Sequence, residues 1–348
     1  MTPRERWKAV LDRRTPDRIP CDFWSTPEVL SRLLRELRCP TEDDLWRALG
    51  IDRAHDVAPR FVGPEERKDN LWMIEVKEQV YGDGLGSYAE LSHAPFAEFS
   101  EPEELVDFPW PDPDWFDFSR VADDLERVRE WPIRGGGFEP FNLYCAMRGL
   151  ELAFMDLATE SPFLEAALER IFDFHYEFNR RLFEAAGWGA IDFTYVAEDF
   201  GGQNALLMSP DKIERFFIPR MKAMIDLAHA HGVRAFHHDD GAIRRIIPRM
   251  IEIGIDILNP IQWRCAGMER EGLKRDFGEQ VVFHGGVDNQ QSLPFGSPKD
   301  VRMEVLENIR ILGAGGGYIV APCHNIQPVS PTENILALYE AVRVASGG

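Results

Sequence analysis

From residue 132 onward the chain alternates short apolar runs with segments of helical period, and this alternation limits the possible folds more than any other feature. The strand-like runs lie at 132–137, 190–196, 233–238, 255–259, 281–285 and 318–321. Helices are predicted to begin at the serine-proline pairs 209–210, 297–298 and 330–331, with the first reaching about residue 231. Repeated β-loop-α units of this length predict a parallel sheet.

A closed barrel is favoured over an open doubly wound sheet. No GxGxxG segment follows an early strand, and ionisable residues recur at the end of one predicted strand after another. Active sites of barrels collect at the carboxyl ends of the strands, so this recurrence is typical of that fold. We therefore expect an α/β TIM barrel, (β/α)8, as a single domain over residues 1–348.

The first third of the chain is less regular. A capping box at Thr2-Pro3-Arg4-Glu5 predicts a helix over about 2–13, followed by a strand at 18–24 and a helix at 26–37. An irregular excursion is expected over about 60–118, with a strand or hairpin arm at 71–80. Its last part, 101–118, is acidic and rich in proline, which disfavours regular hydrogen bonding.

Charge and hydropathy exclude several classes of partner. The 59 acidic and 39 basic residues give a net charge of −20, which disfavours nucleic acid and anionic membrane surfaces. No apolar run approaches the roughly 18 residues of a spanning helix, and Arg4, Glu5 and Arg6 stand where a signal peptide would be apolar. The five cysteines form no CxxC pair. We expect a cytoplasmic protein with reduced thiols.

Three chemically active clusters follow predicted strands: Glu198-Asp199, the HHDDG run at 237–241, and Cys323-His324. Strand alternation points His238 and Asp240 the same way, and the thiolate of Cys323 completes the three protein ligands of an open zinc site. Two alternatives remain open. The aspartates cap a helix over 242–253 while one histidine packs in the core, or Cys323 is only a small buried side chain.

Other residues are expected to contact the reacting groups. Glu198 and Asp199 form a pair of like charges that raises a pKa, as a proton shuttle requires, although binding an arginine or capping a helix also explains them. His284 is a third catalytic candidate, with a further metal ligand or a core residue as alternatives. The predicted substrate-binding residues are Phe23, Arg148, Gln203, Gln262 and Asn325. At 135–137, three glycines either form a turn or let a ligand approach the backbone.

Several short motifs together resemble the uroporphyrinogen decarboxylase superfamily. They are TPRER at 2–6, PDRIP at 16–20, RG at 148–149, DL at 156–157, EDFGGQ at 198–203, HxDG at 238–241, GGVD at 285–288 and PCHNIQ at 322–327. The motifs extend over nearly the whole chain. This resemblance implies a (β/α)8 barrel, in agreement with the strand pattern.

Within that superfamily the chain looks more like the corrinoid-linked methyltransferases. The decarboxylases hold substrate carboxylates with an arginine-rich segment, where this chain has CDFWSTPEV at 21–29. The methyltransferase branch binds zinc through H-x-C and a later cysteine. By this resemblance His238 and Cys323 fall on ligand positions, and Asp240 replaces the middle cysteine. Cobalamin is expected on a separate corrinoid protein, because the chain lacks a D-x-H-x-x-G motif.

The sequence therefore predicts a zinc-dependent methyltransferase that moves a methyl group between a small substrate and a corrinoid or thiol. Two alternatives remain. A decarboxylase of the same superfamily would use Glu198 or Asp199 as the acid and Arg148 to hold a carboxylate. A non-catalytic binding barrel is less favoured, because carboxylates and thiols buried at one mouth are costly without chemistry.

Overall fold

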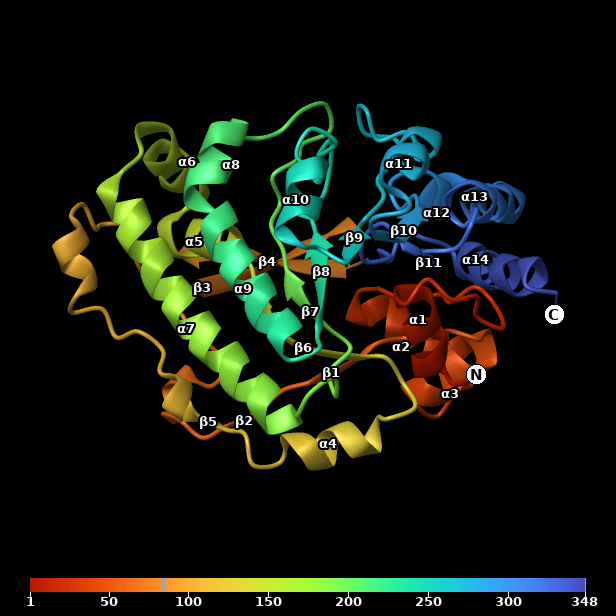
Figure 1. Cartoon of the computed structure of the whole chain (residues 1–348), viewed down its shortest axis with the longest axis horizontal. Coiled ribbons are helices and arrows are strands. Elements are labelled where there is room, and N and C mark those ends of the chain that lie inside the picture. Colours follow the sequence, from red (N-terminus) through yellow and green to blue (C-terminus); the bar gives the residue numbers. More distant parts are fainter. Residues whose placement is uncertain (83–85, 348) are drawn as a thin grey trace.

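Seven parallel strands form a curled sheet with helices on its outer side (Figure 1). The computed structural model describes residues 1–82 and 86–347. The strand order is β1-β6-β7-β8-β9-β10-β11. The bounds are β1 His55–Val57, β6 Ile133–Phe138, β7 Phe193–Val196, β8 Arg234–His238, β9 Ile257–Asn259, β10 Val282–Val287 and β11 Tyr318–Pro322. Each strand-like run from residue 132 onward thus forms a strand of one parallel sheet, as predicted.

The strand predicted at 18–24 is not a regular strand. Cys21 and Ser25 form isolated parallel bridges with Val320 and Ile326, and the amide of Asp52 donates to the carbonyl of Cys21 at 2.7 Å. These bonds place the segment between β11 and the start of β1. Pro20 has no amide hydrogen to donate, so pairing stays local. The described residues therefore show a seven-stranded curled sheet, and an eight-stranded closed barrel remains a prediction.

Helices fill the connections between strands. Their bounds are α1 Pro3–Leu11, α2 Pro27–Glu36, α3 Glu42–Leu49, α4 Val121–Arg127, α5 Pro140–Arg148, α6 Leu150–Thr159, α7 Pro162–Ala186, α8 Pro210–Phe216, α9 Ile218–Ala230, α10 Ile247–Ile253, α11 Arg270–Phe277, α12 Ser292–Phe295, α13 Pro298–Leu312 and α14 Thr332–Ala345. The predicted capping box at the start of α1 is present, with reciprocal bonds between Thr2 and Glu5.

Two helix predictions were wrong in their bounds. The helix expected from Ser209 to about residue 231 is broken into α8 and α9, because Pro219 cannot donate an amide hydrogen bond to the preceding turn. The helix expected over 242–253 begins only at Ile247. Asp239 and Asp240 are therefore too far from its first turn to cap it.

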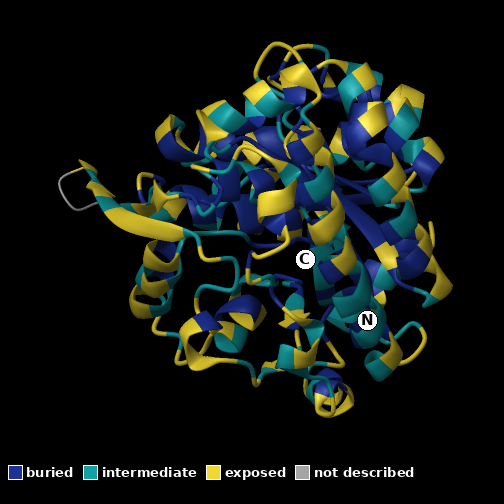
Figure 2. Cartoon of the chain, turned by 90° about the vertical axis from the view of Figure 1, so that its left-hand side faces the viewer, coloured by how far each residue is buried: buried dark blue, intermediate teal, exposed yellow. Residues whose placement is uncertain are grey.

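The excursion at 60–118 contains more regular structure than expected. β2 (Arg60–Phe61) pairs antiparallel with β5 (Phe116–Asp117), and β3 (Glu75–Tyr81) pairs with β4 (Gly86–His93), as the predicted hairpin arm requires. Short 3-10 turns lie at Glu65–Arg67, Pro102–Leu105 and Pro113–Trp115. The β3–β4 hairpin projects from the body of the molecule, and most of its side chains are exposed (Figure 2).

The inside of the curled sheet is filled with apolar side chains. Trp7 of α1 stacks on Phe193 of β7, with ring centroids 5.3 Å apart, and they pack with Phe236, Ile257 and others in one buried cluster. This core separates α1 from the carboxyl ends of the strands, where the polar side chains gather. No helix among the described residues is both long enough and apolar enough to cross a membrane.

Candidate functional site

The ends of β8 and β11 bring three potential metal ligands together. One ligand atom each from His238, Asp240 and His324 lie within 4.8 Å of one another, and all three residues are half-buried. His238 is the last residue of β8, and Asp240 follows on the same side of the chain. The predicted H-x-D pair thus forms one side of the cluster, and His324, just beyond β11, forms the other.

Hydrogen bonds set the orientation of His238. Its Nδ1 lies 2.6 Å from the side-chain oxygen of Asn259, an acceptor, so Nδ1 carries the proton. Nε2 is then left with its lone pair, 3.8 Å from Oδ1 of Asp199. A ring held by its other nitrogen in this way is the usual arrangement of a metal-binding histidine.

The carboxylate of Asp240 is also held from behind. Gln262 donates from Nε2 to Oδ1 of Asp240 at 3.0 Å, and its own oxygen accepts from the amide of Gly241 at 2.7 Å. Burial raises the pKa of the Asp240 carboxyl, His238 opposes this rise, and the like charge of Asp199 adds to it. A cation bound at the cluster would stabilise the charged carboxylate that burial disfavours.

The neighbours in the HHDDG run point the other way, as strand alternation predicts. His237 and Asp239 are fully buried, and Asp239 accepts amide hydrogens from Phe200 at 2.8 Å and Gly201 at 3.3 Å. Burial raises the pKa of Asp239 to about 6, although the ring of His237, with Nε2 3.6 Å from Oδ2, opposes this rise. The two amide bonds to Asp239 hold the loop after β7, which carries Asp199 beside the cluster.

The structure places Cys323 outside the cluster. Its amide donates to the carbonyl of Val287 at 2.8 Å, so the chain remains paired with β10 for one residue beyond β11. Its buried Sγ lies 3.4 Å from the carbonyl oxygen of Ile261. Burial, with nearby carboxylates, raises the pKa of this thiol well above its usual value despite one backbone hydrogen bond. The third position, where we expected Cys323, is taken by His324, because successive side chains alternate in direction.

The two predicted acids have different surroundings. Glu198 is buried and accepts from the amides of Phe141 at 2.6 Å and Asn142 at 3.2 Å, in the first turn of α5. Burial raises its pKa well above the usual value, although these amides oppose the rise. Glu198 therefore caps α5, whereas the alternative role we considered was a cap for the helix that begins beyond Ser209. Asp199 is half-exposed beside His238 and accepts from the amide of Asp240 at 3.2 Å.

His284 belongs to a buried hydrogen-bond chain behind His238. Asn259 donates to Nδ1 of His284 at 2.8 Å, and Nε2 of His284 lies 3.2 Å from the carboxylate of Asp22. Burial raises the pKa of Asp22, but the bond from His284 and the charge of Arg53 outweigh it and leave the pKa below its usual value. Asp22 and Asn259 were not identified from the sequence. Their positions after short apolar runs were the only signal.

The predicted substrate-binding residues have different surroundings. Gln262 is at the cluster, as described. Phe23 is buried against Trp46, with ring centroids 4.8 Å apart. Arg148 binds the carboxylate of Asp156 at 2.8 Å and the carbonyls of Phe96 and Phe99. The ring of Phe23 is thus part of the core, and the guanidinium of Arg148 already has protein partners. Both side chains are buried and leave little surface for a substrate.

Gln203 and Asn325 lie on loops around the mouth. The carbonyl of Gln203 accepts from the amide of Ala266 at 3.1 Å, and its side-chain oxygen lies 3.6 Å from Sγ of Cys265. The carbonyl of Asn325 accepts from Gln327 at 3.3 Å. Their contact with a substrate remains a prediction.

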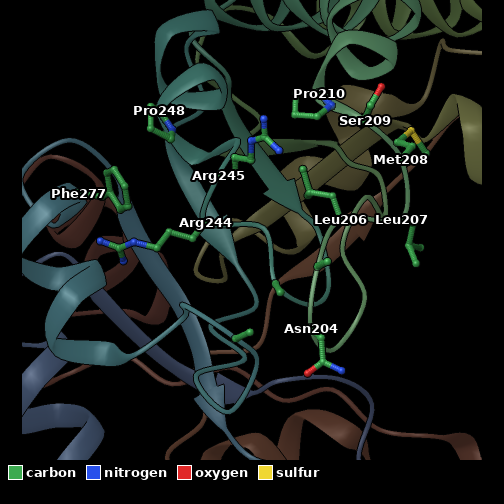
Figure 3. A pocket seen from close by; sticks show the side chains of 13 residues that line it. Asn204, Leu206, Leu207, Met208, Ser209, Pro210, Arg244, Arg245, Pro248 and Phe277 are labelled. Atoms are coloured by element: carbon green, nitrogen blue, oxygen red, sulfur yellow. The ribbon is translucent and has the colours of Figure 1, made fainter.

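A large cavity is lined by the loop after β7 and by the segment that follows Asp240. It has a volume of about 930 Å³ and is formed by the loop from Asn204 to Ser209 together with Ala242, Arg244 and Arg245 (Figure 3). Arg244 pairs with Asp276 and lies over the ring of Phe277. Ala242 is two residues beyond Asp240, but none of the three cluster residues lines the cavity.

Comparisons with known proteins identify a family for this chain. The sequence model of "Uroporphyrinogen decarboxylase (URO-D)" matches residues 97–344. A uroporphyrinogen decarboxylase of Pseudoalteromonas translucida (strain TAC 125) is 24% identical over 285 residues, 74% of this chain and 73% of that protein. One from Anaeromyxobacter sp. (strain Fw109-5) is 29% identical over 131 residues, 37% of this chain, and the match spans only 35% of that relative.

Among solved structures, a methyltransferase from Methanosarcina mazei is similar over 99% of both chains, with a TM-score of 0.66 and 19% identity. At this identity the likeness shows the fold alone. The family model, in contrast, matches well over half of the sequence, from the excursion to the last helix. The chain therefore belongs to the uroporphyrinogen decarboxylase (URO-D) family.

Proposed function

We propose that this protein is a zinc-dependent methyltransferase that moves a methyl group between a small substrate and a corrinoid or thiol. The observation that carries the proposal is the cluster of His238, Asp240 and His324 at the carboxyl ends of the strands. Two imidazoles and a carboxylate are a donor set that suits zinc and leave a coordination position open for a substrate. The methyltransferase from Methanosarcina mazei shares this fold, so the fold is one that can carry the proposed reaction.

The spacing of the cluster is compatible with a metal ion. Ligand atoms around a tetrahedral zinc lie roughly 3.4 Å apart, given metal–ligand bonds of about 2.1 Å. The three ligand atoms here lie within 4.8 Å of one another, so small side-chain rotations close the site. Because Nδ1 of His238 donates its hydrogen bond to Asn259, Nε2 has a free lone pair. Nε2 is therefore the atom that a metal ion would bind.

The chain's own residues have separate tasks in this proposal. His238, Asp240 and His324 would hold the zinc ion, which would act as a Lewis acid towards an atom of the substrate. Asn259 and Gln262 hold His238 and Asp240 in place. The half-exposed carboxylate of Asp199 can exchange a proton with a group bound beside His238. With nitrogen and oxygen ligands in place of thiolates, the site is harder than a sulfur-rich one and favours polarising oxygen or nitrogen.

The corrinoid would be carried by a separate protein in this scheme. The 930 Å³ cavity is lined by the loop after β7 and by Ala242, two residues beyond Asp240, but by none of the three cluster residues. A transient partner that presents methylcobalamin at the carboxyl ends of the strands is part of the proposal.

Decarboxylation remains the second candidate, since both relatives compared above are uroporphyrinogen decarboxylases. It would use Asp199 as the acid. Arg148, which we expected to hold the substrate carboxylate, is instead bound to Asp156 and two carbonyls. A decarboxylase would need a different cation for that task, so we rank this reaction second.

The two reactions are separated by one pair of assays. Zinc-loaded protein should demethylate methylcobalamin in the presence of a panel of thiols, followed by corrinoid absorbance, and should leave uroporphyrinogen unchanged. His238→Ala should lose this activity, while the exposed His93→Ala should retain it. Consumption of uroporphyrinogen at about 1 per second or faster, with no change in the corrinoid spectrum, would establish the decarboxylase instead.

A further inference from the structure

A second cavity opens beside β6, on the side where β1 ends. It has a volume of about 690 Å³, within the range of small-molecule sites. Its walls carry the rings of Trp72, Phe174, Phe178 and Tyr195, and the backbone of Gly136–Gly137 forms part of its surface. We call it the β6 cavity. Its lining contains none of His238, Asp240 and His324, so it is separate from the metal-ligand cluster.

The β6 cavity exists because β6 is longer than its neighbour. β1 pairs with β6 only as far as Val57 and Gly135, while β6 continues to Phe138. Beyond this point the fully buried Asn179 of α7 replaces a strand. Its oxygen accepts from the amide of Gly137 and its nitrogen donates to the carbonyl of Gly137, both at 3.0 Å. The side chain of Asn179 thus satisfies the hydrogen-bonding groups of Gly137 at the edge of β6. It takes up less space than another strand would, and the remaining space is the cavity.

Two of the three glycines in β6 are required by the fold, and Gly137 is not. A side chain at Gly135 would approach Ile191 to 2.6 Å, and Gly136 has φ +71° and lies so close to Asn179 that a Cβ would clash with it. A Cβ at Gly137 would meet only Tyr195, at an ordinary 3.9 Å, and no positive φ requires glycine there. The missing side chain at 137 therefore serves to keep the cavity open.

The polar groups around the cavity define what it can hold. Trp72 stacks on His175, with centroids 5.4 Å apart and planes 9° apart. Arg134 is neutralised by Asp56, and its guanidinium lies 4.4 Å from the centre of the Tyr195 ring. Within residues 1–82 and 86–347, the Glu139 carboxylate forms no hydrogen bond or ion pair. The walls thus combine aromatic faces with one uncompensated negative charge.

We propose that the β6 cavity is a binding site for a flat aromatic molecule that carries an amine. The rings hold the aromatic part, the bare backbone at Gly137 allows the ring to lie against β6, and Glu139 binds the ammonium group. A cation near aromatic faces is further stabilised by the ring electrons. This site does not depend on the proposed methyl transfer.

A matched series of three indoles tests the charge preference. Tryptamine, indole and indole-3-acetate share one ring system and differ in charge, and their binding to the full-length protein is measured by calorimetry. Tryptamine should bind about tenfold or more tightly than indole-3-acetate, with indole between them. Failure of the wild-type protein to bind any of the three at millimolar concentration would overturn the proposal, as would the reverse order.

Variants locate the binding. Gly137→Leu should abolish binding of all three compounds, and Gly137→Ala, which fits the backbone, should weaken it without lowering the melting temperature. Glu139→Gln should reduce tryptamine binding to the level of indole and leave indole unchanged. The exposed Trp188→Ala, with 80% of its side chain accessible, is the control. Tryptamine binding that is equal in wild type, Gly137→Ala and Glu139→Gln would place the ligand elsewhere and refute the site.

Discussion

The side-chain oxygen of Asn259 lies 2.6 Å from Nδ1 of His238, while its nitrogen lies 2.8 Å from Nδ1 of His284. One amide therefore fixes the proton positions of two histidines in opposite ways. His238 carries its proton on Nδ1 and presents a bare Nε2 to the cluster. His284 carries its proton on Nε2, where Asp22 accepts it. The fully buried asparagine thus links the metal-ligand cluster, through His284, to the carboxylate of Asp22 in the segment that bridges β11.

The first prediction follows from this link. Asn259→Ala should lower zinc affinity about 10- to 100-fold, as removal of such orienting partners usually does, because His238 can then rotate or protonate Nε2. Calorimetric titration of metal-free protein measures the affinity. Asn204→Ala, an exposed residue in the loop after β7, is the control. Unchanged affinity in Asn259→Ala would show that His238 does not need this hydrogen bond.

The cysteines provide a second prediction. Cys323 is buried and its thiol pKa is raised, so the thiolate is scarce at neutral pH. In metal-free native protein, iodoacetamide should modify the half-buried Cys39 first and leave Cys323 unmodified until the protein unfolds. Peptide mass spectrometry over time gives the order. Rapid native labelling of Cys323 would contradict the buried position of its sulfur.

A third prediction concerns pH and His175, in the wall of the β6 cavity. Burial lowers its pKa from the ordinary value of 6.5 to about 4, although a hydrogen bond to the carbonyl of Ile171 opposes this. Because the unfolded chain binds this proton more tightly, the contribution to stability is present above about pH 6.5 and is lost as pH falls to about 4. The loss amounts to at most about 3 kcal/mol.

Urea unfolding across this pH range tests the assignment. His175→Gln should remove the corresponding part of the pH dependence, and the exposed His93→Gln should not. Identical pH dependence in wild type and His175→Gln would mean that His175 titrates normally in the folded protein.

A fourth prediction compares two neighbouring glycines. Gly136→Ala should destabilise the protein by about 3 kcal/mol, because it combines a positive φ with a clash against the buried Asn179. Gly137→Ala should change stability by less than about 1 kcal/mol. Chemical denaturation gives the free energy of unfolding of the two variants. Equal losses of stability would contradict the inference that Gly136 is required by the fold and that Gly137 is not.

Sequence patterns predicted correctly those features that depend only on residues near one another in the chain. The H-x-D spacing at the end of β8 placed His238 and Asp240 together because strand side chains alternate. The capping box at Thr2 likewise fixed the start of α1. The expected ligand Cys323 and His324, which lies in the cluster, are adjacent in the sequence. Which of the two side chains faces the cluster depends on how far pairing with β10 continues past β11. Such pairing is a long-range property that the local pattern does not contain.

Long-range contacts also explain the other differences. Asp22 reaches His284 across most of the sequence, and only the folded sheet brings them together. The predicted strand at 18–24 has suitable residues, but Pro20 limits its pairing to isolated bridges. We predicted Glu198 as a catalytic residue and Arg148 as a substrate-binding residue. Whether such charged residues serve catalysis or hold helices depends on partners that sequence spacing does not reveal.

The metal content of two adjacent variants tests the central claim most directly. Wild type, Cys323→Ala, His324→Ala and the control His93→Ala are purified without an affinity tag, loaded with zinc, dialysed and analysed by elemental mass spectrometry. The cluster of His238, Asp240 and His324 predicts about one zinc per chain in wild type, Cys323→Ala and His93→Ala, and loss of most zinc in His324→Ala. Retention of zinc by His324→Ala with loss in Cys323→Ala would contradict this site and restore the cysteine as the ligand.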